Sequence, residues 1–564
     1  MDDATESLLA RARAWAAEDP DPVTARELEE LIDAGDTAEL EDRFGGVLEF
    51  GTAGLRGALG AGPRRMNRVV VLRAAAGLAA YLQETGADPA AGVVIGYDAR
   101  HNSEVFARDT AEVMAGAGVR ALVLPRPLPT PVLAFAIRDL GCAAGVMVTA
   151  SHNPPQDNGY KVYLGDGSQI VPPADAGIAA QIAAVGPVAG IPRGDDVQIV
   201  GEDLVTRYQD TVVALVEGGD AGARRALTIV YTPLHGVGGE TVRQVLNRAG
   251  FPAPHVPAAQ AEPDPDFPTV AFPNPEEPGA LDQATQLAAE LGADLVVAND
   301  PDADRCAVAV PSDGDADQPG GWQMLRGDEV GALLAAHLLG EGKEGVYAQS
   351  IVSSSLLGTM AAAAGQPHQE TLTGFKWIGR IPGLAFGYEE ALGYCVDPDH
   401  VKDKDGVSAL LLVCELAALV KSQGRSLRGV LDDVARKHGL HATDQLSVRF
   451  TDLAQIPATM ARLRESPPTS LGGLAVERVD DLSLGTPALP PTDGLRYALA
   501  DGARVIVRPS GTEPKVKCYL EVVVPVEPSS APSGEDSTDV DAARIAAVGR
   551  LDAIRADIQK AAGL

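Results

Sequence analysis

Basic residues are scarce in this chain of 564 residues. Lys and Arg number 46 against 78 Asp and Glu, which gives a formal charge of −32. A charge of that sign repels the phosphate backbone of nucleic acids and anionic membrane surfaces. We therefore expect neither as a partner, and an anionic small molecule must be held by local clusters of Arg, Lys and backbone N–H groups.

Cysteine and long apolar runs are scarce as well. The five cysteines lack CxxC spacing, which argues against a disulfide framework or a zinc site and predicts buried thiols. No apolar run reaches the roughly 18 residues of a membrane span. The longest run, 407–420, contains Glu415 and predicts a buried helix. The first residues are acidic where a signal peptide is basic, so we expect a cytoplasmic protein.

The length and the patterning predict several α/β domains. A single hydrophobic core stops growing near roughly 250 to 300 residues. Short β-branched runs alternate with Ala- and Leu-rich stretches, which predicts α/β layers with largely parallel sheets. These runs lie at 92–98, 120–125, 144–150, 227–233 and 293–300.

The pattern changes near the end of the chain. Residues 504–524 contain two strand-like runs joined by a turn with Pro and Gly, which indicates a hairpin in a smaller α+β domain. A closing helix follows. It is predicted from the spacing of Ile545, Val548, Leu551, Ile554 and Ile558.

Three carboxylates directly follow one of the predicted strands. Asp300, Asp302 and Asp304 alternate along the chain, and in a tight turn this spacing can aim all three at one point. Three hard oxygen ligands suit Mg²⁺ better than a soft metal. A solvated acidic turn is the plain alternative. An EF-hand is excluded, because its sixth position would be Arg305 rather than Gly and its twelfth Pro311 rather than Glu.

A serine follows another predicted strand. We expect the turn to expose Ser151 and to surround it with polar groups that can hold a phosphate. The Gly-x-Ser-x-Gly pattern is missing, and His152 would not normally face the residue before it, so serine-hydrolase chemistry is disfavoured. Taken alone, the segment favours an ordinary Asn- and Pro-rich turn with a capping serine.

The turn of the predicted hairpin is rich in hydrogen-bond donors. From Arg508 to Lys515 it offers a guanidinium, two hydroxyls, an ammonium and backbone amides. A phosphate dianion needs donors of this kind. Two glycine-rich segments, 51–57 and 236–239, are weaker signals, and the second misses the GxGxxG pattern of dinucleotide-binding turns.

Taken together and in this order, six segments resemble the signature loops of the α-D-phosphohexomutase superfamily. They are FGTAGLRG, TASHNPPQDNGYKVY, NDPDADR, TGFKWIG, GYEEALG with DHVKDKDG, and RPSGTEPK. The resemblance spans residues 50–520 and is closest to the long branch of phosphoglucomutases, phosphomannomutases and phosphopentomutases.

The resemblance implies a fold of four domains arranged in a heart shape around a central cleft. Three are related α/β domains with mixed, mostly parallel sheets, and the last is an α+β domain. We expect a domain with the phosphoserine loop at 1–205, one with the metal loop at 206–325, one with the sugar-binding loop at 326–440 and one with the phosphate-binding loop at 441–564. A monomer or a homodimer is expected.

The resemblance also implies roles for individual residues. The catalytic positions are Ser151, Arg56, His152, Lys161 and Lys404. One Mg²⁺ per subunit would be held by Asp300, Asp302, Asp304 and an oxygen of phosphorylated Ser151. The substrate-binding positions are Arg305, Thr373, Gly374, Lys376, Glu389, Arg508, Ser510, Gly511 and Thr512.

The implied activity is that of a phosphosugar mutase, an isomerase of carbohydrate metabolism. It would interconvert sugar 1-phosphates and 6-phosphates, with glucose as the first choice and mannose as the second. The reaction would pass through phosphorylated Ser151 and a bisphosphorylated sugar, which also acts as activator. A phosphopentomutase or a sugar-bisphosphate synthase of the same family is the alternative. Many relatives have a serine where Ala391 follows Glu389 and Glu390, so one hydroxyl that helps to discriminate among sugars is missing.

Two rival classes stay open. A metal-dependent sugar phosphatase would use the same Asp cluster to hydrolyse its substrate. A non-catalytic sugar-phosphate sensor would be expected to have lost the nucleophile or a metal carboxylate, and this sequence retains all of them.

Overall fold

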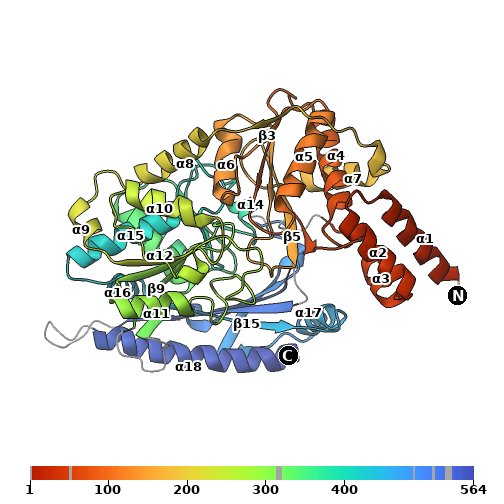
Figure 1. Ribbon diagram of the computed structural model, residues 1–564. Helices are drawn as coiled ribbons and strands as arrows, with labels where there is room; N and C mark the ends of the chain where they lie inside the picture. Colours follow the sequence, from red (N-terminus) through yellow and green to blue (C-terminus); the bar gives the residue numbers. More distant parts are fainter. Residues whose placement is uncertain (1–2, 50–53, 313–320, 487–488, 511–514, 527–536) are drawn as a thin grey trace. The chain divides into compact units, whose positions relative to one another are not determined.

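The computed structural model describes residues 3–49, 54–312, 321–486, 489–510, 515–526 and 537–564 (Figure 1). The chain forms two compact units. The first comprises Met1–Met324 and Asp397–Ala418, and the second comprises Leu325–Val396 and Leu419–Leu564. Each unit contains two of the four sheets found in the described residues. The expected bounds of the four domains stay predictions.

Three helices open the first unit. They are α1 (Asp3–Glu18), α2 (Pro22–Ala34) and α3 (Thr37–Phe44). The side chains of Asp21 and Asp36 accept hydrogen bonds from backbone N–H groups in the first turns of α2 and α3. Trp15 meets Phe44 edge-on with the ring centroids 6.0 Å apart. Both rings belong to the core that also contains the first sheet.

The first sheet has the strand order β1-β5-β4-β2-β3-β6. Its strands are β1 (Leu55–Ala58), β2 (Val93–Tyr97), β3 (Ala121–Val123), β4 (Ala144–Val148), β5 (Asp157–Leu164) and β6 (Val197–Ile199). Strands β2, β3, β4 and β6 are parallel, and β5 runs antiparallel to β4 and β1. The helices of this layer are α4 (Arg68–Glu84), α5 (Ser103–Gly116), α6 (Thr130–Asp139) and α7 (Ala174–Ala184). Every residue of β2 and β4 is buried, as expected for parallel strands covered on both faces.

The second sheet has the order β10-β9-β8-β7. Its strands are β7 (Ile229–Thr232), β8 (Leu295–Ala298), β9 (Ala307–Pro311) and β10 (Trp322–Met324), and the helices that follow α7 are α8 (Glu202–Ala214), α9 (Ala221–Arg225), α10 (Gly238–Arg248) and α11 (Asp282–Leu291). The sheet is mixed: β7 and β8 are parallel, while β9 returns antiparallel to β8. Only residues 299–306 join β8 to β9, which is too short for the crossover that a parallel return requires.

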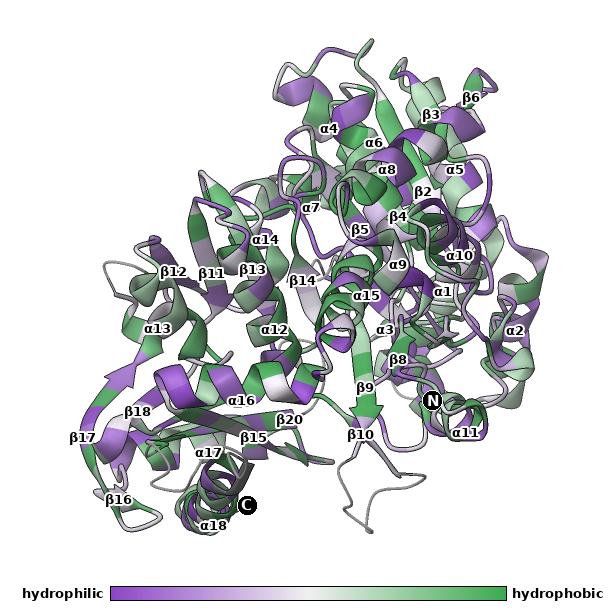
Figure 2. Ribbon diagram, turned by 90° about the vertical axis from the view of Figure 1, so that its left-hand side faces the viewer, coloured by the Kyte–Doolittle hydropathy of each residue, from purple (hydrophilic) through white to green (hydrophobic). Residues whose placement is uncertain are grey.

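Two predictions about buried apolar groups are confirmed. The apolar run 407–420 lies within α15 (Gly406–Ser422), where most of its side chains are buried. Figure 2 shows this helix largely in the hydrophobic colour. The five cysteines are free and buried. In the described part of the chain, no single helix is long and apolar enough to cross a membrane.

The third sheet belongs to the second unit and has the order β12-β11-β13-β14. Its strands are β11 (Val346–Ser350), β12 (His368–Thr371), β13 (Leu384–Glu389) and β14 (Gly393–Cys395), and the helices are α12 (Gly327–Gly340), α13 (Leu356–Ala363), α14 (Phe375–Ile378) and α16 (Leu427–His438). Strand β11 is parallel to both β12 and β13, whereas β14 is antiparallel to β13. Like the first two sheets, this one is therefore mixed.

The fourth sheet is antiparallel throughout, with the order β15-β20-β19-β18-β17-β16. Its strands are β15 (Leu440–Arg449), β16 (Ser470–Leu471), β17 (Leu474–Asp481), β18 (Leu495–Leu499), β19 (Arg504–Pro509) and β20 (Lys515–Val524), with helices α17 (Gln455–Glu465) and α18 (Ser537–Ala562). Strands β19 and β20 are the predicted hairpin. Helix α18 lies along β15 and β20 (Figure 1). The predicted combination of three α/β layers and a final α+β layer is confirmed.

The closing helix is confirmed, and only some of the residues whose spacing predicted it are buried. Ile545 and Val548 are 76% and 58% exposed. The buried stripe includes Val540, Ala543, Ala547, Leu551, Ile554 and Ile558. Two of these are alanines, and a pattern built on large apolar residues overlooks them. The helical spacing therefore located the helix without specifying which of its residues are buried.

Truncation at two positions of α18 tests this face. Ile554→Ala removes a fully buried side chain and should destabilise the C-terminal sheet by about 2 to 5 kcal/mol. The matched change Ile545→Ala should cost less than about 0.5 kcal/mol, because that side chain is exposed. Hydrogen exchange of the β15 and β20 amides measures the local effect in a chain with several domains. Equal exchange rates in the two variants would contradict the assignment.

Candidate active site

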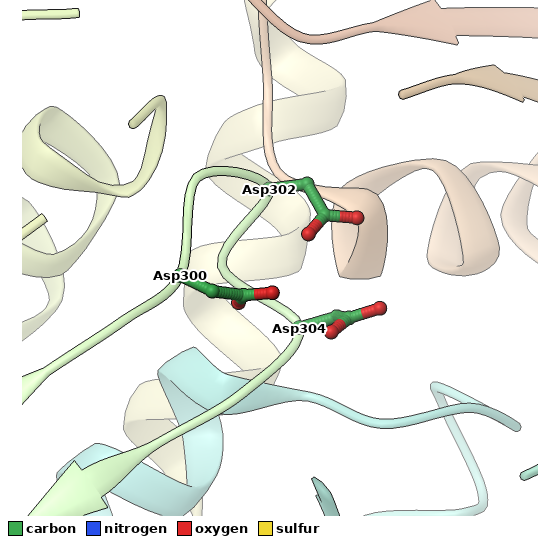
Figure 3. A group of neighbouring side chains, drawn as sticks. All are labelled: Asp300, Asp302 and Asp304. Carbon is green, nitrogen blue, oxygen red and sulfur yellow. The ribbon is translucent and has the colours of Figure 1, made fainter. Parts of the chain in front are cut away.

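The loop that joins β8 to β9, residues 299–306, is called the carboxylate loop below. The N–H of Ala303, whose φ is 53°, donates to the carbonyl of Asp300 over 2.8 Å and closes a tight turn. Figure 3 shows Asp300, Asp302 and Asp304 leaving this loop on the same side. One oxygen from each lies within 4.8 Å of the others, and all three residues are buried. The turn thus brings the three alternating carboxylates together.

The oxygens of these carboxylates fall into two kinds. Oδ2 of Asp302 accepts hydrogen bonds from Thr130 Oγ1 at 2.6 Å, Ser151 Oγ at 3.2 Å and Lys161 Nζ at 2.8 Å. By contrast, no described group donates to the buried atoms Asp300 Oδ2, Asp302 Oδ1 and Asp304 Oδ1. A buried polar atom without a partner is costly. One such oxygen from each of three carboxylates is the donor set of a hard divalent cation, so the residues fit a metal ion.

The electrostatics of the loop are uneven. Burial and the neighbouring charges of Asp302 and Asp304 raise the pKa of Asp300 well above its usual range. Burial also acts to raise the pKa of Asp304, but Lys161 and Lys404 outweigh it and lower that pKa. Their Nζ atoms lie 3.1 and 3.2 Å from Asp304 Oδ2. A cation held by the three carboxylates would favour the ionised form of Asp300 as well.

Residues 149–157, which join β4 to the start of β5, form the serine loop. Ser151 has a φ of 51°, a left-handed conformation that residues other than glycine seldom adopt. Its N–H donates to Thr149 Oγ1 over 2.9 Å. The expectation that the turn exposes the serine is wrong, since Ser151 is only 3% exposed. Its hydroxyl is turned inward and bonds to Asp302 instead.

Cationic and neutral nitrogen donors lie beside this serine. Arg56 in β1 donates through Nη1 to Asn153 Oδ1 over 3.0 Å. Its Nε and the Nδ1 of His152 are buried, and neither bonds to a described group. Burial, followed by the charges of Arg305 and Arg56, lowers the pKa of His152 well below its usual range, so the ring is neutral near pH 7. Buried nitrogens of this kind can satisfy the oxygens of a phosphate.

Two further predicted residues lie close to the aspartates of the carboxylate loop, one within the loop and one outside it. Arg305 lies with Nε 3.9 Å from Asp300 Oδ2 and Nη1 3.7 Å from Glu276 Oε2. Lys404, in the segment before α15, contacts Asp304 as described and also lies 3.4 Å from Asp403 Oδ1. The first unit therefore assembles the predicted catalytic and metal positions with Arg305.

The remaining predicted substrate positions belong to the second unit. Glu389, the last residue of β13, accepts the N–H of Gly374 through Oε1 over 2.7 Å. Thr373 precedes that glycine and is partly buried. The ammonium of Lys376 lies 5.8 Å from the ring centroid of Trp377. Glu389 and the segment from Thr373 to Lys376 thus lie together.

Glu390 has different partners from Glu389. Its Oε2 accepts hydrogen bonds from Ser350 and Ser353 over 3.2 and 3.0 Å. Burial and the charge of Glu389 raise the pKa of Glu390.

At the turn after β19, the N–H of Ser510 donates to the carbonyl of Lys515 over 2.8 Å.

The predicted phosphate clamp is described only in part. Arg508 lies in β19, where it pairs with Lys517 of β20. Ser510 ends the described part of the turn. Gly511 and Thr512 lie outside the described residues.

Sequence reasoning missed two residues that contact these loops. Thr130, at the start of α6, donates both its hydroxyl and its N–H to Asp302, over 2.6 and 2.9 Å. Arg100 bonds to the backbone of the serine loop. Arg100 had a detectable signal, because Asp98-x-Arg100 directly follows β2, the parallel neighbour of β4. Thr130 had none, because its position depends on how α6 packs.

Four family models match consecutive parts of the chain. They are phosphoglucomutase/phosphomannomutase alpha/beta/alpha domains I at 47–187, II at 206–317 and III at 326–438, and the C-terminal domain at 446–527. The chain belongs to the phosphoglucomutase/phosphomannomutase family. The resemblance to the α-D-phosphohexomutase superfamily is thereby confirmed.

Individual relatives agree with this membership. A protein of Haemophilus influenzae named probable phosphomannomutase is 49% identical over 464 residues, covering 81% of this chain and 93% of its own. A Schizosaccharomyces pombe protein named probable phosphoribomutase is 38% identical over 555 residues, covering 90% and 92%. A solved structure of a candidate phosphomannomutase from Thermus thermophilus is 27% identical, covers 85% of this chain and 96% of its own, and superposes with a TM-score of 0.68.

The family assigns the class of chemistry. The protein is a phosphomutase, an isomerase that acts as an intramolecular phosphotransferase, and its substrates are sugar phosphates. The buried Asp300, Asp302 and Asp304 suit the magnesium that such a reaction uses.

Changing one carboxylate tests whether the loop binds a metal ion. Asp300→Asn should weaken the binding of Mg²⁺ or Mn²⁺ at least about tenfold in calorimetric titrations, because it removes a charged ligand. Asp109→Asn is the matched control. Asp109 is equally buried, but its two oxygens bond to Arg68 and Arg193. Unchanged metal affinity in Asp300→Asn, or an equal loss in both variants, would contradict the assignment.

Proposed function

We propose that this phosphomutase interconverts the 1-phosphate and 6-phosphate of a hexose, glucose before mannose, through phosphorylated Ser151 and a bisphosphorylated sugar. The hydroxyl of Ser151 carries the proposal, because it lies 3.2 Å from Asp302 within a set of buried carboxylates. A hydroxyl nucleophile beside a metal-binding loop is what phosphoryl transfer through the protein requires. A purely structural serine would have no need of that loop.

In the resting enzyme we propose that Ser151 carries the phosphate. Arg56 and His152 would then bond to its oxygens through nitrogens that bond to no described group. Magnesium, held by Asp300, Asp302, Asp304 and a phosphate oxygen, would neutralise charge on the group being transferred.

The transfer itself exchanges one ester for another. The bond between phosphorus and Ser151 Oγ breaks, a bond to the sugar oxygen forms, and the proton of the sugar hydroxyl ends on Ser151. Lys161 or Lys404 would move that proton. Although burial opposes it, the charges of Asp302 and Asp304 raise the pKa of Lys161, so Lys161 holds its proton.

The second unit would hold the rest of the substrate. We propose that Glu389, with the segment Thr373–Lys376, contacts sugar hydroxyls, and that Arg508 with Ser510 to Thr512 holds the phosphate that is not reacting. Glu390 fits this role less well, since Ser350 and Ser353 already bond to its carboxylate. Between the two transfers the bisphosphorylated sugar turns, so that Ser151 next accepts the other phosphate. Added bisphosphate would therefore act as an activator.

A pentose substrate is the second candidate function. Ala391 supports it, because the missing hydroxyl removes one contact that would select among sugars. One of the similar proteins described above is named a phosphoribomutase. A sugar-bisphosphate synthase of the same family would use the same phosphoserine.

Replacing the nucleophile tests the mechanism. Ser151→Ala should lower kcat for conversion of glucose 1-phosphate to glucose 6-phosphate by at least about 10⁴-fold, since the covalent route is lost. The measurement is a coupled assay for the 6-phosphate, run beside an assay for inorganic phosphate. Release of phosphate without 6-phosphate would indicate the phosphatase instead. Full mutase activity in Ser151→Ala would exclude Ser151 as the nucleophile.

Substrate preference is tested by comparing kcat/KM for glucose, mannose and ribose 1-phosphates. We expect the highest value for glucose 1-phosphate. In Ala391→Ser the ratio between the best and the worst sugar should rise by about tenfold or more, because a hydroxyl-specific contact is added. A wild-type preference for ribose 1-phosphate would favour the phosphopentomutase.

A further inference from the structure

Arg100 lies beneath the serine loop and is 4% exposed. It follows β2, which pairs in parallel with β4, so the carboxyl ends of both strands lie at the same edge of the sheet. None of the sequence signatures includes it. The side chain of Arg100 nevertheless makes four hydrogen bonds to the serine loop, more than the hydroxyl of Ser151 makes to described groups.

The guanidinium donates only to backbone carbonyls of the serine loop. Nη2 bonds to the carbonyls of Ser151 and Asn153 over 2.6 and 2.5 Å. Nη1 bonds to those of Pro154 and Asp157 over 2.8 and 3.2 Å. A guanidinium has five N–H donors, and four of them are used here. No donor on Nη1 or Nη2 is left for a substrate, so Arg100 can act only through the loop.

The remaining faces of Arg100 are also occupied. Its Nε lies 3.4 Å from Asp98 Oδ2, close enough for an ion pair but outside hydrogen-bond geometry. Oδ1 of Asp98 accepts the backbone N–H of Arg100 over 3.0 Å and the hydroxyl of Ser103 over 2.6 Å. The ring of Phe267, which is 2% exposed, lies with its centroid 4.8 Å from the guanidinium carbon. The aromatic cover shields the four hydrogen bonds from water and adds a cation–π contact.

This arrangement offers a reason for the conformation of Ser151. A left-handed non-glycine residue persists only where its surroundings over-determine it. The carbonyl of Ser151 is fixed by Arg100, its N–H by Thr149 and its hydroxyl by Asp302. Of these three partners, Arg100 alone bonds through its side chain to backbone carbonyls at both ends of the serine loop.

We propose that Arg100, covered by Phe267, is a positioning residue that sets the serine loop so that the Ser151 hydroxyl stays aimed at the carboxylate loop. The proposal rests on the function proposed above, because it takes Ser151 as the reacting group. It adds a requirement that the signature motifs do not contain. The serine loop is held by the planar guanidinium of an arginine, and a lysine cannot replace it because an ammonium cannot supply four donors in one plane.

Arg100→Lys removes the planar set of four donors and keeps the positive charge, so it tests whether that geometry matters. We expect kcat to fall by about 10- to 100-fold, the loss that follows from misplacing a reacting atom by about 1 Å. KM should change by less than about threefold, because Arg100 touches no substrate. Turnover is expressed per serine that takes up labelled phosphate from a hexose bisphosphate, so that unfolded protein does not count.

The chain offers a matched control in Arg224. That arginine is also buried, donates to the carbonyls of Val216 and Ala249, and lies 5.7 Å from the ring centroid of Phe251. Its side-chain partner is Glu415, far along the chain from the serine loop. Arg224→Lys should therefore lose stability comparably while keeping kcat within about twofold of the wild type.

The outcomes separate the two proposals. A fall in kcat confined to Arg100→Lys supports the positioning role, and equal kcat per labelled site in both lysine variants overturns it. If Arg100→Lys does not fold, kcat is compared between Phe267→Leu and Phe251→Leu. A loss of kcat only in Phe267→Leu supports the positioning role, and equal kcat values in the two variants overturn it. A wild-type enzyme that forms no sugar 6-phosphate would instead refute the proposed function.

Discussion

Three carboxylates with oxygens within 4.8 Å of one another, all removed from water, repel each other strongly unless cations balance them. The loop between β8 and β9 creates this condition, because eight residues must reverse the chain and three alternate ones are aspartates. Lys161 and Lys404 provide part of the balance, and both contact Asp304. A divalent cation would supply the remaining positive charge. The carboxylate oxygens that bond to no described group are the ligands that such a cation takes.

The same constraint explains how Ser151 is placed. The hydroxyl of Ser151 lies beside the carboxylates because it donates to Asp302. The left-handed backbone at Ser151 allows the side chain to take this position. Arg56 and His152 each have a buried nitrogen that bonds to no described group, and under the proposed function these nitrogens would bond to a phosphate on that hydroxyl. The protein as a whole is strongly acidic, so local positive charge would have to attract a phosphate to this site against the overall negative field. Shielded, fixed charges of this kind are what phosphoryl transfer depends on.

Much of this was predictable from the sequence, and the exceptions have physical causes. The strands before Ser151 and Asp300 could be located because apolar runs end there in polar motifs. The burial of Ser151 could not, because its hydroxyl bonds to the carboxylate loop, which is distant in sequence. The exposure of Ile545 and Val548 could not be predicted either, because helical spacing alone does not say which stripe meets the sheet. Arg100 had a signal in its position after a predicted strand, but its partners are backbone carbonyls, and no side-chain motif reveals those bonds.

The central claim is that Ser151 carries the phosphate passed between positions of the sugar. It is tested most directly by incubating the enzyme with a hexose bisphosphate labelled in phosphate and mapping the labelled peptide. We predict about one label per chain on Ser151, and quantitative transfer of that label to sugar when unlabelled glucose 1-phosphate is added. Label on another residue, or label that leaves only as inorganic phosphate, would contradict the account.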